Sequence, residues 1–132
     1  ASDVYKRQVQ IGTRFALTEE SSASPVFKDY CLSLGEGDTK LLLKKLAPTR
    51  LVKNAFREAV EKAEDSGASA EDLRTLLGRG RAKKGIFEGD LEEGELEIGQ
   101  VSAIISRRQS VAEVMNELVA AYQRAAKKDY LF

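Results

Sequence analysis

The sequence predicts an α/β protein in which helices predominate and one or two strands belong to a larger sheet. Apolar residues recur at helical spacing in several stretches of the 132-residue chain, whereas residues 9–15 alternate between apolar and polar side chains, as strands do. A lone strand or a single hairpin is marginally stable in water. We therefore expect these residues to be part of a larger α/β fold that supplies the missing strands.

The first predicted element is a strand within residues 9–15 (Val-Gln-Ile-Gly-Thr-Arg-Phe) that ends at Gly12-Thr13. Its apolar residues, Val9, Ile11 and Phe15, fit an inner strand of a barrel better than an exposed edge. A complete (β/α)8 barrel needs roughly 200–250 residues. The chain is too short for that, so we expect only part of such a barrel.

A helix is predicted to begin at Ser24-Pro25, because serine caps a helix well and proline suits its first position. Apolar side chains continue it at helical spacing as far as Leu34. Residues 35–38 (Gly-Glu-Gly-Asp) predict a turn that ends the helix.

Residues 39–46 could form a strand or a helix, and we favour a strand because Asp38 and Pro48 bracket the segment closely. A longer amphipathic helix is then predicted to open at Pro48-Thr49 and to end at Ser66-Gly67. The apolar stripe expected on it consists of Leu51, Val52, Ala55, Phe56, Ala59, Val60 and Ala63.

The C-terminal half of the sequence predicts three further helices, the first of which is followed by a glycine-rich stretch. A short helix from Ser69 is expected to end at Gly78, and the residues from 78 to about 95 are expected to form an irregular loop. Residues 99–105 are small and apolar, and predict a buried helix. In the last helix Ser110 and Glu113 predict a capping box, followed by an apolar stripe of Val111, Val114, Met115, Leu118, Val119 and Tyr122.

The composition excludes several classes of protein. The 21 basic residues balance the 21 acidic ones, which argues against a protein that mainly coats nucleic acid or an anionic membrane. One cysteine and no histidine exclude a disulfide framework and remove the usual metal ligand and general base, so no metal site is expected. Without a signal peptide or an apolar run of about 20 residues, the expected location is cytoplasmic.

The first eight residues look foreign to the fold. Residues 3–8 (Asp-Val-Tyr-Lys-Arg-Gln) resemble an in-frame translation of a transposon adapter used in sequencing libraries. We interpret residues 1–8 as a scar, although a short polar arm is the alternative. Because the chain is short and has no initiator Met, we expect residues 9–132 to be a portion of a longer protein.

The strongest candidate binding motif is Gln10-Ile11-Gly12-Thr13. A glycine at the C-terminal tip of a parallel strand lets backbone amides approach an anion, and a neighbouring hydroxyl can donate to a phosphate oxygen. In (β/α)8 barrels the loops after the last strands are the usual phosphate site. The alternative is that Gly12-Thr13 only forms a turn.

Three other features predict structure rather than chemistry. The basic cluster at 79–84 lacks aromatic residues and adjoins an acidic run, so a solvated loop is favoured over an anion site. The acidic run at 88–97 does not have the spacing of an EF-hand loop. Cys31 lies on the apolar stripe of its helix, which predicts a buried thiol rather than a nucleophile.

Several motifs occur in a characteristic order: residues 9–15, Thr-Glu-Glu-Ser at 18–21, Pro-Thr-Arg-Leu-Val-Lys-Asn at 48–54, and a Gly-Asp…Gly…Gly-Gln pattern within 89–100. Over about residues 9–126 they resemble the FMN-dependent nitronate monooxygenases, formerly called 2-nitropropane dioxygenases. Their close relatives are the flavin-dependent type II enoyl-acyl-carrier-protein reductases. The resemblance implies that residues 9–132 are the C-terminal part of a (β/α)8 TIM barrel, with its last strand, extra helices and closing helix.

The resemblance also implies site residues. Gln10, Ile11, Gly12 and Thr13 would bind the phosphate of the cofactor FMN. Gly99 and Gln100 would line the flavin and substrate cavity, although Gln100 could equally cap or cross-link nearby helices. The histidine of the family lies in an upstream Gly-Gly-His stretch that this sequence lacks, so no catalytic residue is expected within the chain.

The implied activity is oxidation of alkyl nitronates by O₂ to carbonyl compounds and nitrite, and the rival is NAD(P)H-dependent enoyl reduction. The expected partners are FMN, a nitronate or enoyl thioester, and the missing N-terminal half of the barrel; a homo-oligomer is compatible with this. An alternative of another class is a small helical interaction module without catalysis. In that case the apolar stripes at 52–63 and 111–122 would pack together or bind a partner helix.

Overall fold

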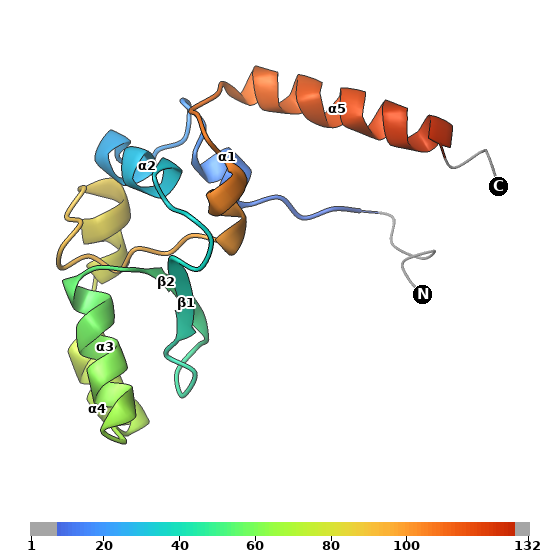
Figure 1. Ribbon diagram of the computed structural model, residues 1–132. Helices are drawn as coiled ribbons and strands as arrows, with labels where there is room; N and C mark the ends of the chain where they lie inside the picture. Colours follow the sequence, from blue (N-terminus) through green and yellow to red (C-terminus); the bar gives the residue numbers. More distant parts are fainter. Residues whose placement is uncertain (1–7, 129–132) are drawn as a thin grey trace.

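The computed structural model describes residues 8–128 and shows a mixed α/β chain (Figure 1). Helices predominate, and the sheet of the described residues has two strands. Of the segment 1–8 that the sequence marks as foreign, only Gln8 is among the described residues. The elements in chain order are α1 (Thr13–Ala16), α2 (Pro25–Leu32), β1 (Thr39–Leu42), β2 (Thr49–Val52), α3 (Ala55–Asp65), α4 (Ala70–Leu77), the π-helical turn η1 (Lys83–Phe87), the 3₁₀-helix η2 (Gln100–Ile104) and α5 (Val111–Lys128).

The strand predicted within residues 9–15 is not formed in this chain. Residues 8–12 have no regular secondary structure, and Thr13 begins the single turn of α1. A strand exists only where a neighbour pairs with its backbone. Within residues 8–128 the paired strands are β1 and β2, so the segment has no sheet to join.

The strand favoured at 39–46 is confirmed for its first half, because β1 pairs antiparallel with β2 over four residue pairs, from Thr39↔Val52 to Leu42↔Thr49. The helix predicted from Pro48 is therefore wrong at its start. Residues 49–52 form β2, and α3 begins only after Asn54, whose Oδ1 accepts a hydrogen bond from the Arg57 backbone N–H (2.9 Å).

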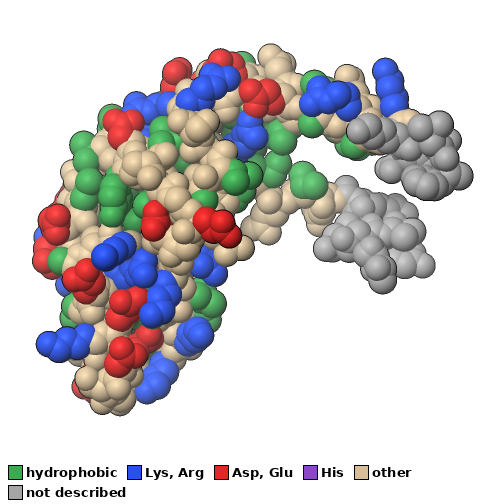
Figure 2. All heavy atoms as spheres, in the orientation of Figure 1, with side chains coloured by type: hydrophobic (Ala, Val, Ile, Leu, Met, Phe, Trp, Pro, Cys, Tyr) green, Lys and Arg blue, Asp and Glu red, His purple; other side chains and the backbone are tan. Residues whose placement is uncertain are grey.

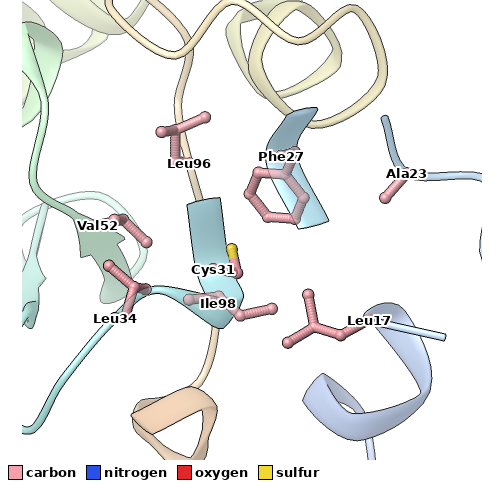
Figure 3. Packing of buried hydrophobic residues seen from close by; sticks show 8 residues of the cluster. All are labelled: Leu17, Ala23, Phe27, Cys31, Leu34, Val52, Leu96 and Ile98. Carbon is pink, nitrogen blue, oxygen red and sulfur yellow. The ribbon is translucent and has the colours of Figure 1, made fainter. Parts of the chain in front are cut away.

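The two buried residues of β2 explain why the helix was predicted there. Leu51 and Val52 are both fully buried, but they point into different cores, since neighbouring side chains of a strand face opposite sides. Val52 packs with residues of α2 and the segment after η1, as Figure 3 shows. Leu51 packs with Phe56, Val60 and Leu73 of α3 and α4. A strand buried on both faces lacks the alternation that identifies strands.

The stretch predicted as irregular loop, from residue 78 to about residue 95, is more ordered than expected. It contains η1, and residues 95–98 then run beside β2. The Val52 backbone N–H donates to the Leu96 carbonyl (2.9 Å), and Leu51 forms an antiparallel bridge with Glu97. This pairing carries the chain to Gly99, next to α1.

Helix starts with local capping signals are confirmed. Ser24 Oγ accepts from the Val26 N–H at the start of α2, and Ser69 and Asp72 form a reciprocal capping box at α4. Ser110 and Glu113 do the same before α5: Glu113 Oε2 accepts from the Ser110 N–H (2.8 Å), and Ser110 Oγ accepts from the Glu113 N–H (3.1 Å).

Two C-terminal apolar segments are less buried than predicted. The segment 99–105 is a 3₁₀-helix rather than a buried α-helix, and its Ile104 side chain is 81% exposed. In α5, which projects from the rest of the chain in Figure 1, Val114 is buried but Met115, Val119 and Tyr122 are exposed. Between α5 and residues 9–15 lies an apolar groove of about 600 Å³, and hydrophobic side chains are visible there in Figure 2. No helix within residues 8–128 is long and apolar enough to cross a membrane.

Candidate functional site

The predicted motif Gln10-Ile11-Gly12-Thr13 lies on the surface at the entry to α1. Gln10 and Gly12 are exposed, whereas Ile11 and Thr13 are half-buried. A Cβ atom placed on Gly12 would have no heavy atom within 4 Å apart from its chain neighbours. The motif is therefore open to a ligand.

The structure brings this motif into contact with the second predicted site segment. The Gly99 backbone N–H donates a hydrogen bond to Thr13 Oγ1 (2.9 Å), although the two residues are 86 positions apart. A Cβ atom on Gly99 would lie 2.5 Å from Thr13 Oγ1, so glycine is needed for the contact. Because the threonine oxygen accepts from Gly99, its own hydroxyl hydrogen remains available to donate to a ligand.

Gln100, the other candidate of this segment, is exposed at the first position of η2. Its side chain makes no hydrogen bond to another described residue that would cross-link the helices.

An open pocket of about 470 Å³ adjoins the Thr13–Gly99 contact, and we call it the Thr13–Gly99 pocket. Three separate stretches line it: Thr13 and Ala16 of α1, residues 48–50 at the start of β2, and residues 97–99. Thr13, residues 48–50 and residues 97–99 each fall within one of the motifs that carry the family resemblance. Arg50 and Glu97 are its charged residues, and sequence reasoning assigned neither to the site. The only signal for Arg50 was the motif at 48–54, which was interpreted as a helix start.

A polar network ties α1 to the start of α5. Arg14 Nη2 donates to Gln109 Oε1 (3.3 Å) and forms an ion pair with Glu117. Gln109 Nε2 in turn donates to Glu117 Oε1 (2.7 Å). Gln109 is buried, so this network fixes the orientation of α1 and hence of the neighbouring Gly12 and Thr13.

A carboxylate pair lies next to the pocket. Glu95 is 7% exposed, and burial together with the hydrogen bond and the charge of Glu97 raises the pKa of Glu95 to about 7, against the opposing charge of Arg81. Glu97 is exposed and lines the Thr13–Gly99 pocket. The contact between Glu95 and Glu97 therefore lies at the edge of the pocket.

Two other polar groups have structural roles. Cys31 is fully buried, and burial raises the pKa of its thiol to about 12, so the thiol stays protonated and is a poor nucleophile. Arg81, from the basic cluster at 79–84, donates to the carbonyls of Leu76, Leu77 and Glu93 and covers the Phe56 ring. Among the described residues no group of three or more His, Cys, Asp or Glu side chains is placed to hold a metal ion.

Comparison with known proteins agrees with these motifs. The family model for nitronate monooxygenase matches residues 7–121. The chain belongs to the nitronate monooxygenase family. That assignment confirms the resemblance found in the sequence, and the match extends over α1, the hairpin, η2 and most of α5.

Solved structures similar to this family member include FabK from Thermotoga maritima, with a TM-score of 0.75, 28% identity, and coverage of 91% of this chain and 38% of that chain. A point mutant of the same FabK matches with a TM-score of 0.73 at 24% identity, covering 91% and 35%. The predicted α/β class, as part of a TIM-barrel fold, is thereby confirmed. The chain spans little more than a third of the length of these relatives.

Proposed function

We propose that this chain is part of an FMN-dependent oxidoreductase and that Gln10, Ile11, Gly12 and Thr13 hold the phosphate of FMN. The observation that carries the proposal is the hydrogen bond between the Gly99 N–H and Thr13 Oγ1, which unites the two segments for which the resemblance implies flavin contacts. Membership of the nitronate monooxygenase family supports flavin as the cofactor.

The residues present fit a phosphate group. Gly12 is surrounded by open space, and the Thr13 hydroxyl can donate a hydrogen bond because its oxygen already accepts one. Gly99 and Gln100 would border the same cavity. When bound, the flavin supplies the redox chemistry. The residues of this chain bind and orient it, and no catalytic proton transfer is assigned to them.

We propose that residues 9–132 form the C-terminal portion of a TIM barrel. The apolar groove between α5 and residues 9–15 supports this, because its walls, including Phe15, Met115 and Val119, have no apolar cover among the described residues. The alternative of a helical interaction module expects the apolar stripes at 52–63 and 111–122 to pack together or to bind a partner helix. The two stripes do not pack together, because that of α3 packs against α4 and the hairpin, and no residue of α5 belongs to either described core cluster.

We propose alkyl nitronates as the substrate, with O₂ as the oxidant, on the strength of the family assignment. The rival is enoyl-thioester reduction, which the similarity to FabK, a flavin-dependent enoyl-acyl-carrier-protein reductase, supports. The full-length protein that carries this chain should consume O₂ in the presence of a nitronate without NAD(P)H and release nitrite. NAD(P)H-dependent reduction of an enoyl thioester, without nitronate-dependent O₂ uptake, would favour the rival.

Thr13→Val should weaken FMN binding by the full-length protein about tenfold, because valine keeps the shape of threonine but can neither donate to a charged phosphate nor accept the hydrogen bond from Gly99. Riboflavin, which has no phosphate, should bind the variant and the wild type equally. The measurement is titration of apoprotein with each flavin by fluorescence quenching. Thr75→Val is the matched control, since Thr75 is exposed on α4 and its hydroxyl donates only to the Glu71 carbonyl. Equal FMN affinity of Thr13→Val and Thr75→Val would contradict the assignment.

A further inference from the structure

The Thr13–Gly99 pocket contains one cationic side chain, Arg50, and the phosphate site proposed above does not yet include a positive charge. Arg50 is half-buried on β2, where it lies opposite Leu41 of β1. Because the start of β2 lies beside α1 and residues 97–99, its side chain shares the pocket with Thr13 and Gly99.

Most of the hydrogen-bonding capacity of Arg50 is unused within the described residues. Its Nη1 donates to the Thr39 carbonyl (3.4 Å) and to Thr39 Oγ1 (3.3 Å), and both contacts are long. Among residues 8–128, no carboxylate lies within 4.0 Å of its guanidinium. Thr39 therefore anchors one side of the guanidinium and leaves Nε and Nη2 for a ligand.

Glu97 limits the classes of ligand that the pocket can accept. Glu97 lines the same pocket, and its negative charge would repel a bare anion placed against it. The same carboxylate accepts hydrogen bonds from hydroxyl groups. The pocket therefore suits a phosphate ester of a hydroxyl-bearing chain, with the phosphate on the Arg50 and Thr13 side and hydroxyl groups toward Glu97.

We propose that Arg50 completes the anion site, its guanidinium contacting the phosphate of the bound flavin from within the pocket that it shares with Thr13 and Gly99. This inference rests on the proposed flavin function. A phosphate monoester carries between one and two negative charges near neutral pH, and the planar guanidinium provides paired donors that match its oxygens. Neutral donors such as the Thr13 hydroxyl position the phosphate, and Arg50 compensates its charge.

The test compares FMN with riboflavin on the full-length apoprotein, for the wild type and for Arg50→Gln, Arg50→Lys and Lys44→Gln. Lys44 is an exposed cation on the turn of the same hairpin and does not line the pocket, so Lys44→Gln removes a nearby charge without changing the site. Arg50→Gln should weaken FMN binding about tenfold or more, and Arg50→Lys by less, because lysine keeps the charge but not the planar fork. Riboflavin affinity should be the same in all four proteins.

Each other outcome overturns the inference in a recognisable way. An equal loss of FMN and riboflavin affinity in Arg50→Gln would show that Arg50 only supports the fold. An unchanged FMN affinity in Arg50→Gln would show that Arg50 does not contact the phosphate. If Lys44→Gln lost as much FMN affinity as Arg50→Gln, the effect would be a general one of charge. If the wild type binds neither flavin, the proposed function itself fails and the role of Arg50 fails with it.

Discussion

Replacing Gly94 with alanine should destabilise the protein by about 3 kcal/mol or more, as measured by chemical denaturation. A Cβ atom at this position would lie 2.2 Å from the Gly85 Cα, 2.4 Å from the Asp90 carbonyl oxygen and 2.7 Å from the Gly85 nitrogen. All three are backbone atoms, which cannot rotate away as a side chain can. The new methyl group must therefore separate η1 from the segment that leads to the site.

Gly35→Ala is the matched control for this prediction. Its Cβ would meet only Asp38 Oδ2, at 3.5 Å, which is an ordinary contact, so the stability should change by less than about 1 kcal/mol. If Gly94→Ala gives no soluble protein while Gly35→Ala is recovered normally, the destabilisation is large enough to prevent folding, and the prediction is confirmed. Equal stability of the two variants would contradict the close packing of Gly94 against Gly85.

Gly94 matters for function because it begins the segment that connects the buried cores to the Thr13–Gly99 pocket. Its carbonyl accepts a hydrogen bond from Asn54 Nδ2 (2.7 Å), and Asn54 also caps α3. The next residues, 95–98, run beside β2 and end at Gly99, which contacts Thr13. One asparagine thus fixes the start of α3 and the position of the segment that reaches α1.

Local signals in the sequence predicted the parts of the fold that depend on local contacts. A capping side chain bonds to the backbone two or three residues away, so Ser24, Ser69 and Ser110 identify helix starts without knowledge of the rest of the fold. The burial of Cys31 followed from its place on the stripe of α2 in the same way.

Elements that depend on distant partners were predicted less well. Residues 9–15 have the composition of a strand but no neighbour to pair with in residues 8–128, and residues 49–52 were assigned to a helix although they pair with β1. The exposed face of α5 shows the same dependence, since an apolar stripe predicts burial only where a covering element exists. Sequence periodicity describes what a segment can bury, but the partner decides whether it is buried.

The residues of the candidate site also fall into two groups, those found from the sequence and those found only from contacts in the structure. The motifs at 10–13 and 99–100 were found by resemblance, and the structure adds the contact between Thr13 and Gly99. Arg50 and Glu97 could not be assigned from the sequence, because the pairing of residues 95–98 with β2 is what places both on one pocket. Their roles depend on three-dimensional neighbours that lie 47 positions apart in the chain.

The second large effect is a dependence of stability on pH through Glu95. Its pKa in the folded chain is raised to about 7, above the ordinary value of 4.5, so the folded state holds a proton that the unfolded state releases. The contribution of Glu95 to stability is therefore complete below pH 4.5, falls as the pH rises toward 7, and is lost above that. We expect the free energy of unfolding to fall by about 2 kcal/mol between pH 5 and pH 8 on this account.

Glu95→Gln should remove this loss, because glutamine keeps the size of the side chain and can donate a hydrogen bond to Glu97 without a proton to release. Denaturation curves at pH 5 and pH 8 should show a variant similar to the wild type at pH 5 and about 2 kcal/mol more stable at pH 8. Glu36→Gln, in the exposed turn before β1, should follow the wild type at both pH values. If Glu95→Gln also follows the wild type, then the burial of Glu95 beside Glu97 does not disfavour the charged form of Glu95, which would contradict the prediction.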